Sequence, residues 1–429
     1  MTDNMKLGYM DKLGLFRKDA KLFIASMAAS ALASGMNGVI FNLYLFKAGY
    51  LEDFIGLFLS TSLFATASVA FLAGMITDRA SRKRILLTSN AISLVAVAIQ
   101  YSTLEPMGLL ISQALLGASS AFVQVAWSPY ITDLSTERER AHLFGFSSGT
   151  AQLSVLFGNI LGGVLPGVLL VFLGPHVSLL DAYRLTLWLS LLPLIISTVL
   201  VIPMTHDSNV GRKSRLGVSN VKHWGFIGRY TLTIGTTGLG AGMIVTFFSL
   251  YFFTEFKANQ ELIGLIFGIN TVVLASGNFL AAALADRMGK VKTVILTEAL
   301  SIPFLFSLSW APELHIAVFV YVTRNVLMNM AGPMSNVFFM ESLTKEERAT
   351  AVGVVRTADS FVRGIASNIG GLLLVSGQYR LPYLIVTVLY VIAVGMFYAF
   401  FRHSEAQMRA LRETEVTHEA KPEESADVT

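Results

Sequence analysis

The sequence predicts an all-α membrane protein of twelve transmembrane helices, arranged as two pseudo-symmetric halves of six helices each. Hydrophobic residues make up 54% of the 429 residues and charged residues only 14%, against roughly a quarter in soluble domains. The chain also repeats itself, because 136–141 (TERERA) returns at 344–349 (TKEERA) and Asp78-Arg79 returns as Asp286-Arg287, both displaced by 208 positions. A repeat of this length predicts two homologous halves side by side, since solenoid units span only about 20 to 50 residues.

Twelve apolar segments are each close to the ~20 residues that cross a hydrocarbon core of about 30 Å. They lack the ten-residue alternation of barrel strands, so we expect helices. The first six spans are expected at 20–46, 53–77, 85–103, 107–132, 143–173 and 182–204. The second six are expected at 228–253, 262–285, 292–311, 315–340, 349–375 and 380–402.

The polar connections divide the chain into four parts. Residues 1–204 form the N-terminal half and 228–402 the C-terminal half, joined by a basic cytoplasmic linker at 205–227. The tail at 403–429 is charged and poor in apolar residues, which predicts disorder.

Lysine and arginine set the expected orientation. Of the 32 such residues, 25 lie in the N-terminal stretch, the tail and alternate connections, whereas four lie in the opposite connections. The positive-inside rule therefore predicts that both termini are cytoplasmic, in a plasma (inner) membrane. The chain has no cysteine, and its seven histidines show no ligand spacing, so we expect no metal and no cofactor.

A charged motif follows the second span of each half. The first copy reads Gly74-x-x-x-Asp78-Arg79-x-x-Arg82, and the second reads Asp286-Arg287-x-Gly289-Lys290. With twelve spans and a half-length repeat, this resembles the major facilitator superfamily, whose signature is G-x-x-x-D-R-x-G-R-R/K. Ser81 replaces the inner glycine of the first copy, and Ala282 replaces the leading glycine of the second. The resemblance covers the chain to about residue 402 and implies a secondary transporter.

In that family the motif acts as a gate latch. Asp133 ends the fourth span, and Glu341, again 208 positions later, ends the tenth. We expect Arg79 to pair with Asp133 and Arg287 with Glu341, or with adjacent acids, in the outward-facing state. The alternative is that these charges serve only topology. The predicted cytoplasmic gate comprises Asp78, Arg79, Arg82, Asp133, Asp286, Arg287 and Glu341.

Span five carries the run Gly158-Asn159-x-x-Gly162-Gly163. It resembles the family's antiporter motif G-P-x-x-G-G, with Asn159 at the proline position. Small residues also permit close helix packing. We therefore prefer packing to antiport specificity.

Charged residues inside spans occur only in the second half: Glu298, Arg324, Arg356, Asp359 and Arg363. Each costs at least ~2.5 kcal/mol near mid-membrane unless it is paired or hydrated, so such residues are functional candidates. The last three lie on one stripe of span eleven, where Asp359 is placed to bridge both arginines. Glu298, on span nine at a similar depth, is placed to neutralise Arg356. A structural ion network and a substrate or proton site both fit. Because two arginines keep Asp359 ionised, Glu298 is the better proton carrier.

Polar residues on the first, fourth and tenth spans are the substrate-binding candidates. In the family the first, fourth, seventh and tenth helices line the cavity, and the resemblance places a ligand there. Hydrogen bonding between helices is the alternative for each amide. The candidates are Asn37, Asn42, Gln113, Gln124, Trp127, Arg324, Asn325 and Asn329.

The function expected is secondary active transport of a small organic solute by alternating access, with or without proton coupling. Multidrug/proton antiport is the alternative within transport, and a non-transporting receptor or scaffold is the alternative outside it. The intramembrane arginines favour an anionic or polar solute. We do not expect an enzyme, because the sequence shows no grouping of a nucleophile with a base. The expected partners are a small-molecule substrate, the lipid bilayer and protons, and no nucleic acid. We expect the protein to be a monomer.

Overall fold

The computed structural model describes residues 16–136, 139–205, 221–344 and 347–403, and within these ranges it is helical with no strand. The side chains of residues 78, 79 and 141 are not described. Most of the predicted linker and all but the first residue of the predicted tail lie outside the described residues.

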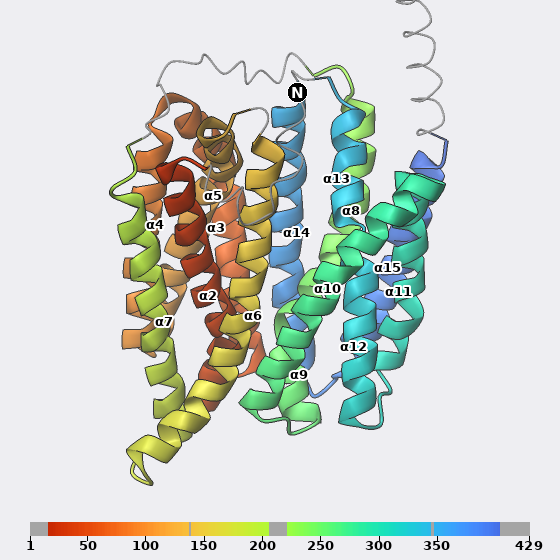
Figure 1. The fold of residues 1–429 in the computed structure, drawn as a ribbon. Helices are drawn as coiled ribbons and strands as arrows, with labels where there is room; N and C mark the ends of the chain where they lie inside the picture. Colours follow the sequence, from red (N-terminus) through yellow and green to blue (C-terminus); the bar gives the residue numbers. More distant parts are fainter. Residues whose placement is uncertain (1–15, 137–138, 206–220, 345–346, 404–429) are drawn as a thin grey trace, which may run out of the picture.

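Six helices form the N-terminal half (Figure 1). Each lies within a few residues of its predicted span. They are α2 (Lys18–Lys47), α3 (Glu52–Arg79), α4 (Arg82–Ser102), α5 (Pro106–Leu134), α6 (Arg140–Leu173) and α7 (Leu179–Val201).

Six further spans form the C-terminal half, and two of them are interrupted. The seventh span consists of α8 (Trp224–Ile244), the short 3-10 helix η2 (Val245–Phe247) and α9 (Phe248–Glu255), and the tenth of α12 (Leu314–Asn329) and α13 (Gly332–Glu341). The continuous ones are α10 (Gln260–Met288), α11 (Lys290–Leu308), α14 (Arg348–Val375) and α15 (Arg380–Phe401). The predicted twelve-helix fold is confirmed.

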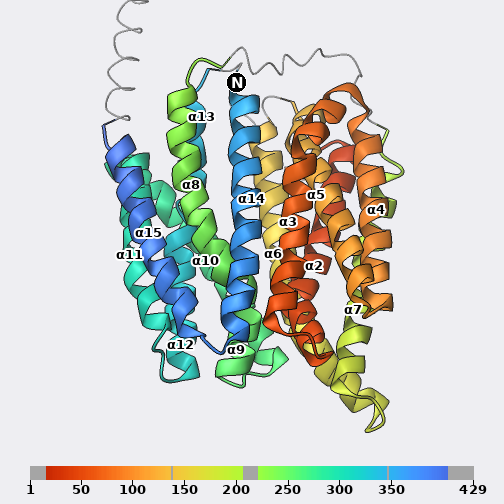
Figure 2. The same ribbon diagram turned by 180° about the vertical axis from the view of Figure 1, so that it is seen from behind.

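Eleven of these spans in the described chain are apolar enough to cross a membrane by length and composition alone. The twelfth is α14, whose three charges Arg356, Asp359 and Arg363 lower its hydropathy. It nevertheless lies inside the bundle, between α3 and α8 (Figure 2). A hydropathy threshold misses this helix because of these charges, of which Asp359 and Arg363 are partly buried and Arg356 is exposed.

Local signals set several helix ends. The Ser81 hydroxyl accepts from the Arg84 N–H at the start of α4, and Ser178 and Asp181 form a capping box on α7. Gly289 has φ 92°, a conformation that favours glycine, and it separates α10 from α11 within one residue. The motif turn in the second half is tight for this reason.

The bundle has two ends, which we name by the chain. The termini side holds the start of α2 and the end of α15, and the far side holds the turns α2–α3, α9–α10 and α14–α15 (Figure 1). The halves meet along two helix pairs, α3 with α14 and α6 with α10. These pairs are related by the repeat.

Glycines make the two crossings close. A Cβ on Gly56 would lie 3.1 Å from the Cα of Gly371, and one on Gly163 would lie 3.0 Å from the Cα of Gly264. The 208-residue shift converts one pair into the other (56 to 264, 163 to 371). Both pairs lie in the far-side portions of their helices, so two symmetry-related glycine contacts close that side.

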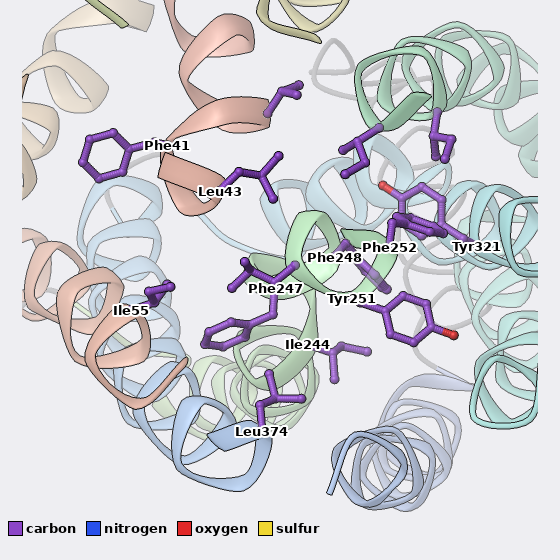
Figure 3. Packing of buried hydrophobic residues seen from close by; sticks show 14 of the residues in the cluster. Phe41, Leu43, Ile55, Ile244, Phe247, Phe248, Tyr251, Phe252, Tyr321 and Leu374 are labelled. Carbon is purple, nitrogen blue, oxygen red and sulfur yellow. The ribbon is translucent and has the colours of Figure 1, made fainter. Parts of the chain in front are cut away.

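Aromatic residues fill the core at the far side, where the two halves share one hydrophobic cluster (Figure 3). Phe41 stacks on Phe58 in the N-terminal half at 5.2 Å between ring centroids. In the other half, Tyr321 lies edge-on to Phe248 at 4.6 Å and to Phe252 at 5.3 Å. This core surrounds the interruption between α8 and α9.

Candidate substrate and coupling site

Polar contacts between the halves reinforce the far-side seal. Tyr379 donates to the Glu52 carboxylate at 2.5 Å, joining the starts of α15 and α3. Asn42 of α2 donates to the carbonyl of Thr246 in η2 at 2.8 Å. Asn42, predicted to bind substrate, therefore holds the interruption of the seventh span in this structure.

On the termini side, ion pairs join helix ends within each half. Arg82 pairs with Asp133, and Lys290 pairs with Glu341 at 2.7 Å. The two pairs are symmetric, since both members are displaced by 208 positions. They therefore latch α4 to α5 and α11 to α13.

The predicted pairs, Arg79 with Asp133 and Arg287 with Glu341 or with adjacent acids, concern the outward-facing state and stay a prediction. In this structure the pairing residue lies three positions later, in the first turn of the following helix, which faces the neighbouring helix end. Asp286 and Arg287 are exposed, and the side chains of Asp78 and Arg79 lie outside the described residues. Lys290 was not included in the predicted gate, although the 208-residue displacement from Arg82 identifies it.

A second latch holds the start of α8. The Glu347 carboxylate accepts from the backbone N–H groups of Lys222 and His223, from the His223 ring at 2.8 Å and from the Thr344 hydroxyl at 3.0 Å. Burial alone would raise the pKa of this carboxyl, but the hydrogen bonds outweigh it and lower the pKa to about 2. Glu347 was not among the predicted site residues, although it lies in the repeated segment 344–349.

The charged stripe of α14 has a different arrangement from the predicted network. Among the described residues, the ion pair of Asp359 is with Arg363, whose Nε donates to both carboxylate oxygens at 2.9 and 2.8 Å. Gly238 of α8 lies against this pair, and a side chain there would collide with the carboxylate. Arg356 instead reaches Gln124 of α5 at 3.4 Å, a contact between the halves, and both residues are exposed.

Glu298 does not neutralise Arg356, contrary to the sequence prediction. It lies on α11, which packs against α10, α12, α13 and α15, whereas α14 packs against α3, α8 and α15. Counting residues gives depth along a helix, but it gives no information on which helices are neighbours. Among the described residues, the Glu298 carboxylate has no hydrogen-bond or ion-pair partner. Tyr230 of α8 lies within its electrostatic reach.

Three N-terminal candidates bind neighbouring helices. Asn37 donates to the Tyr101 hydroxyl at 2.7 Å, Gln113 accepts from Gln100 at 2.7 Å, and Trp127 donates to the Met27 sulfur at 2.7 Å. Their substrate role stays a prediction, with these contacts as the competing explanation.

The tenth span carries three candidates on two faces. Asn325 donates to Asn270 of α10 at 2.8 Å, and Asn329 donates to Asn325 at 3.0 Å. Arg324 points elsewhere, is only 1% exposed and donates through Nη2 to the Tyr390 hydroxyl of α15 at 2.7 Å. The amides thus face α10, and the arginine faces the interior of its own half.

The glycine run of span five packs against helices. Gly162 lies against Met36 of α2, and Gly163 against Gln260 and Gly264 of α10. Asn159 is buried and donates to Thr271 at 3.4 Å. Helix packing therefore accounts for this run.

A family model described as Major Facilitator Superfamily matches residues 22–366 and 230–425. The chain belongs to the major facilitator superfamily. A comparison with curated sequences gives no match. Within the part of this superfamily member that the structure describes, no group of three metal-ligating side chains occurs.

Solved structures share the fold. A bacterial homolog of the human lysosomal transporter Spinster, inward-facing and occupied, is 14% identical with a TM-score of 0.73, covering 89% of this chain and 95% of that one. A point mutant of the nucleoside transporter NupG is 13% identical with a TM-score of 0.73, covering 89% and 99%. A D-xylose–proton symporter is 16% identical with a TM-score of 0.69, covering 92% and 98%.

Proposed function

We propose that this chain is a secondary active transporter that carries a small organic solute across the membrane by alternating access between its halves, with proton coupling through Glu298. The observation that supports this proposal is the distribution of contacts between the halves. The glycine crossings and the bonds of Glu52 and Asn42 join the halves on the far side. Toward the termini side, the described ion pairs join helices of one half, and the polar contact between the halves is the 3.4 Å contact of Arg356 with Gln124. A seal on one side only is what one of two alternating states requires.

The Lys and Arg distribution supports a cytoplasmic termini side, which makes this state inward-facing, and we propose the plasma (inner) membrane as its location. Exposed polar side chains fit this assignment, because an open side should present such groups from both halves. Gln124 of the N-terminal half is exposed, as are Asn329 and Arg356 of the C-terminal half. The symmetric ion pairs Arg82–Asp133 and Lys290–Glu341 keep each half rigid as it rotates.

Proton coupling is assigned to Glu298 because of its isolation. Asp359 is ion-paired with Arg363, whereas Glu298 has no cation beside it among the described residues. A half-buried carboxyl without a cation takes up a proton more readily than a paired one. Its helix packs against α12 and α13, on both sides of the tenth span's interruption.

The absence of cysteine makes the alternating motion measurable by site-directed spin labelling. We would label Met107→Cys with His315→Cys on the far side and Arg84→Cys with Lys292→Cys on the termini side, each pair being exposed and 208 positions apart. The proposal requires two populations whose distances change in opposite directions on the two sides. A single rigid population under all solute and pH conditions refutes transport by this mechanism.

Coupling is tested in proteoliposomes with a solute identified by thermal-shift screening. Glu298→Gln should lose uptake driven by a pH gradient but keep solute exchange in the absence of a gradient. Arg356→Gln is the matched control, because it removes a charge at a similar depth on another helix. Full gradient-driven uptake by Glu298→Gln refutes the coupling assignment.

A further inference from the structure

We infer that Arg324 is the binding site for the anionic group of an organic anion, which names the substrate class and rests on the proposed transport function. The observation is a guanidinium buried inside the membrane domain with free hydrogen-bond donors. No acid pairs with it among the described residues.

Arg324 is among the largest fully buried side chains of the protein. Nη2 is satisfied by Tyr390, but Nε and Nη1 have no hydrogen-bond partner. A guanidinium stays protonated in proteins, so the charge cannot be removed by proton loss. A buried charge without a counterion is strongly unfavourable, and an anion that accepts from these nitrogens would relieve it.

Aromatic rings surround the arginine without satisfying it. Its Cζ lies 5.3 Å from the Tyr390 ring centroid and 5.8 Å from that of Phe248. Ring faces attract the cation, but the free N–H groups point within the guanidinium plane and need acceptors there. The rings therefore form apolar walls of a site whose acceptor must come from a ligand.

Arg324 lies beside the far-side seal, because Phe248 contacts its guanidinium. Phe248 is the first residue of α9, the short piece beyond the interruption at Val245–Phe247, and Asn42 of α2 holds that interruption. When the far side opens, this bond breaks and α9 is free to move from the arginine. The anion then enters from the far side and reaches a site in the C-terminal half alone.

The test measures thermal stabilisation and affinity of the purified protein with carboxylates, each compared with its neutral amide, beginning with benzoate and benzamide. Wild type should prefer at least one acid to its amide by tenfold or more in Kd. Arg324→Gln should lose that preference, Arg324→Lys should keep part of it, and the control Arg229→Gln, at an exposed arginine of α8, should keep all of it. Equal binding of every acid and amide by wild type overturns the inference.

A chloride titration in otherwise chloride-free buffer separates a substrate carboxylate from an inorganic anion. Stabilisation by chloride alone, lost in Arg324→Gln, overturns the substrate assignment. If Arg324→Gln does not fold, Tyr390→Phe and the acid–amide comparison in wild type decide. Failure here is distinct from failure of transport, because the spin-label pairs report exchange of the halves without any anion.

Discussion

The glycine crossings determine how firmly the far side closes, and Gly163→Ala tests this. A Cβ on Gly163 would lie 2.7 Å from the Gln260 carbonyl oxygen and 3.0 Å from the Gly264 Cα, all backbone atoms of the other half. Ordinary contact begins at 3.4 Å, so α6 and α10 must part by 0.7 Å (3.4 minus 2.7). Overpacking of this kind costs about 1–3 kcal/mol. The clash exists only in the sealed state, so the far-side-open state should gain roughly 5- to 150-fold in relative population.

The assay is the distance distribution of the Met107→Cys/His315→Cys spin-label pair. The longer distance should increase in Gly163→Ala, without a matching loss of folded protein. Gly162→Ala is the matched control, because its Cβ also lies 2.7 Å from a carbonyl oxygen, that of Met36, but within its own half. It should lower the melting temperature and leave the distance ratio unchanged. Equal distance shifts in both variants would show that the α6–α10 crossing does not control closure of the far side.

Three further perturbations follow from the ion pairs. Glu347→Gln should flatten the acid dependence of the melting temperature between pH 5 and 3: the folded pKa of about 2 lies below the unfolded value of roughly 4.3, so this carboxylate stabilises above about pH 4 and loses its effect as pH falls toward 2. A double-mutant cycle on Lys290 and Glu341 by thermal denaturation should give a coupling of about 0.2–1 kcal/mol, since both groups are partly exposed; a null coupling in the reconstituted membrane contradicts the latch. Asp359→Asn should cost more stability than Asp359→Asn/Arg363→Gln, because the single change leaves Arg363 unpaired; the reverse order excludes the pair as a unit.

The fold was predictable because its signals are redundant. Apolar length located every span, and the 208-residue displacement revealed the two halves before any contact was known. The interruptions at Val245–Phe247 and at 330–331 were not predicted, because no proline or charge in the sequence distinguishes the first from a continuous helix. The second is followed by Gly332 and Pro333, and Pro333 lies in the first turn of α13, so the sequence carries a signal for that interruption.

The candidate site was predictable in residue type but not in partnership. The second half's charges were all found, yet Glu298 was placed beside Arg356 on equal depth alone. Depth follows from counting residues, whereas adjacency follows from the order in which helices pack around the bundle. Tyr390, which binds Arg324, carried no sequence signal, since it is one of 13 tyrosines in a largely apolar chain.

The interruptions occur in only one copy of the duplicated unit. Within the described chain, α8–α9 and α12–α13 are broken, whereas their N-terminal counterparts α2 and α5 run without a break. Bending stiffness is therefore unequal between two halves of common descent. We expect the N-terminal half to be the stiffer one. Its helix amides should therefore exchange with solvent more slowly than those of the C-terminal half.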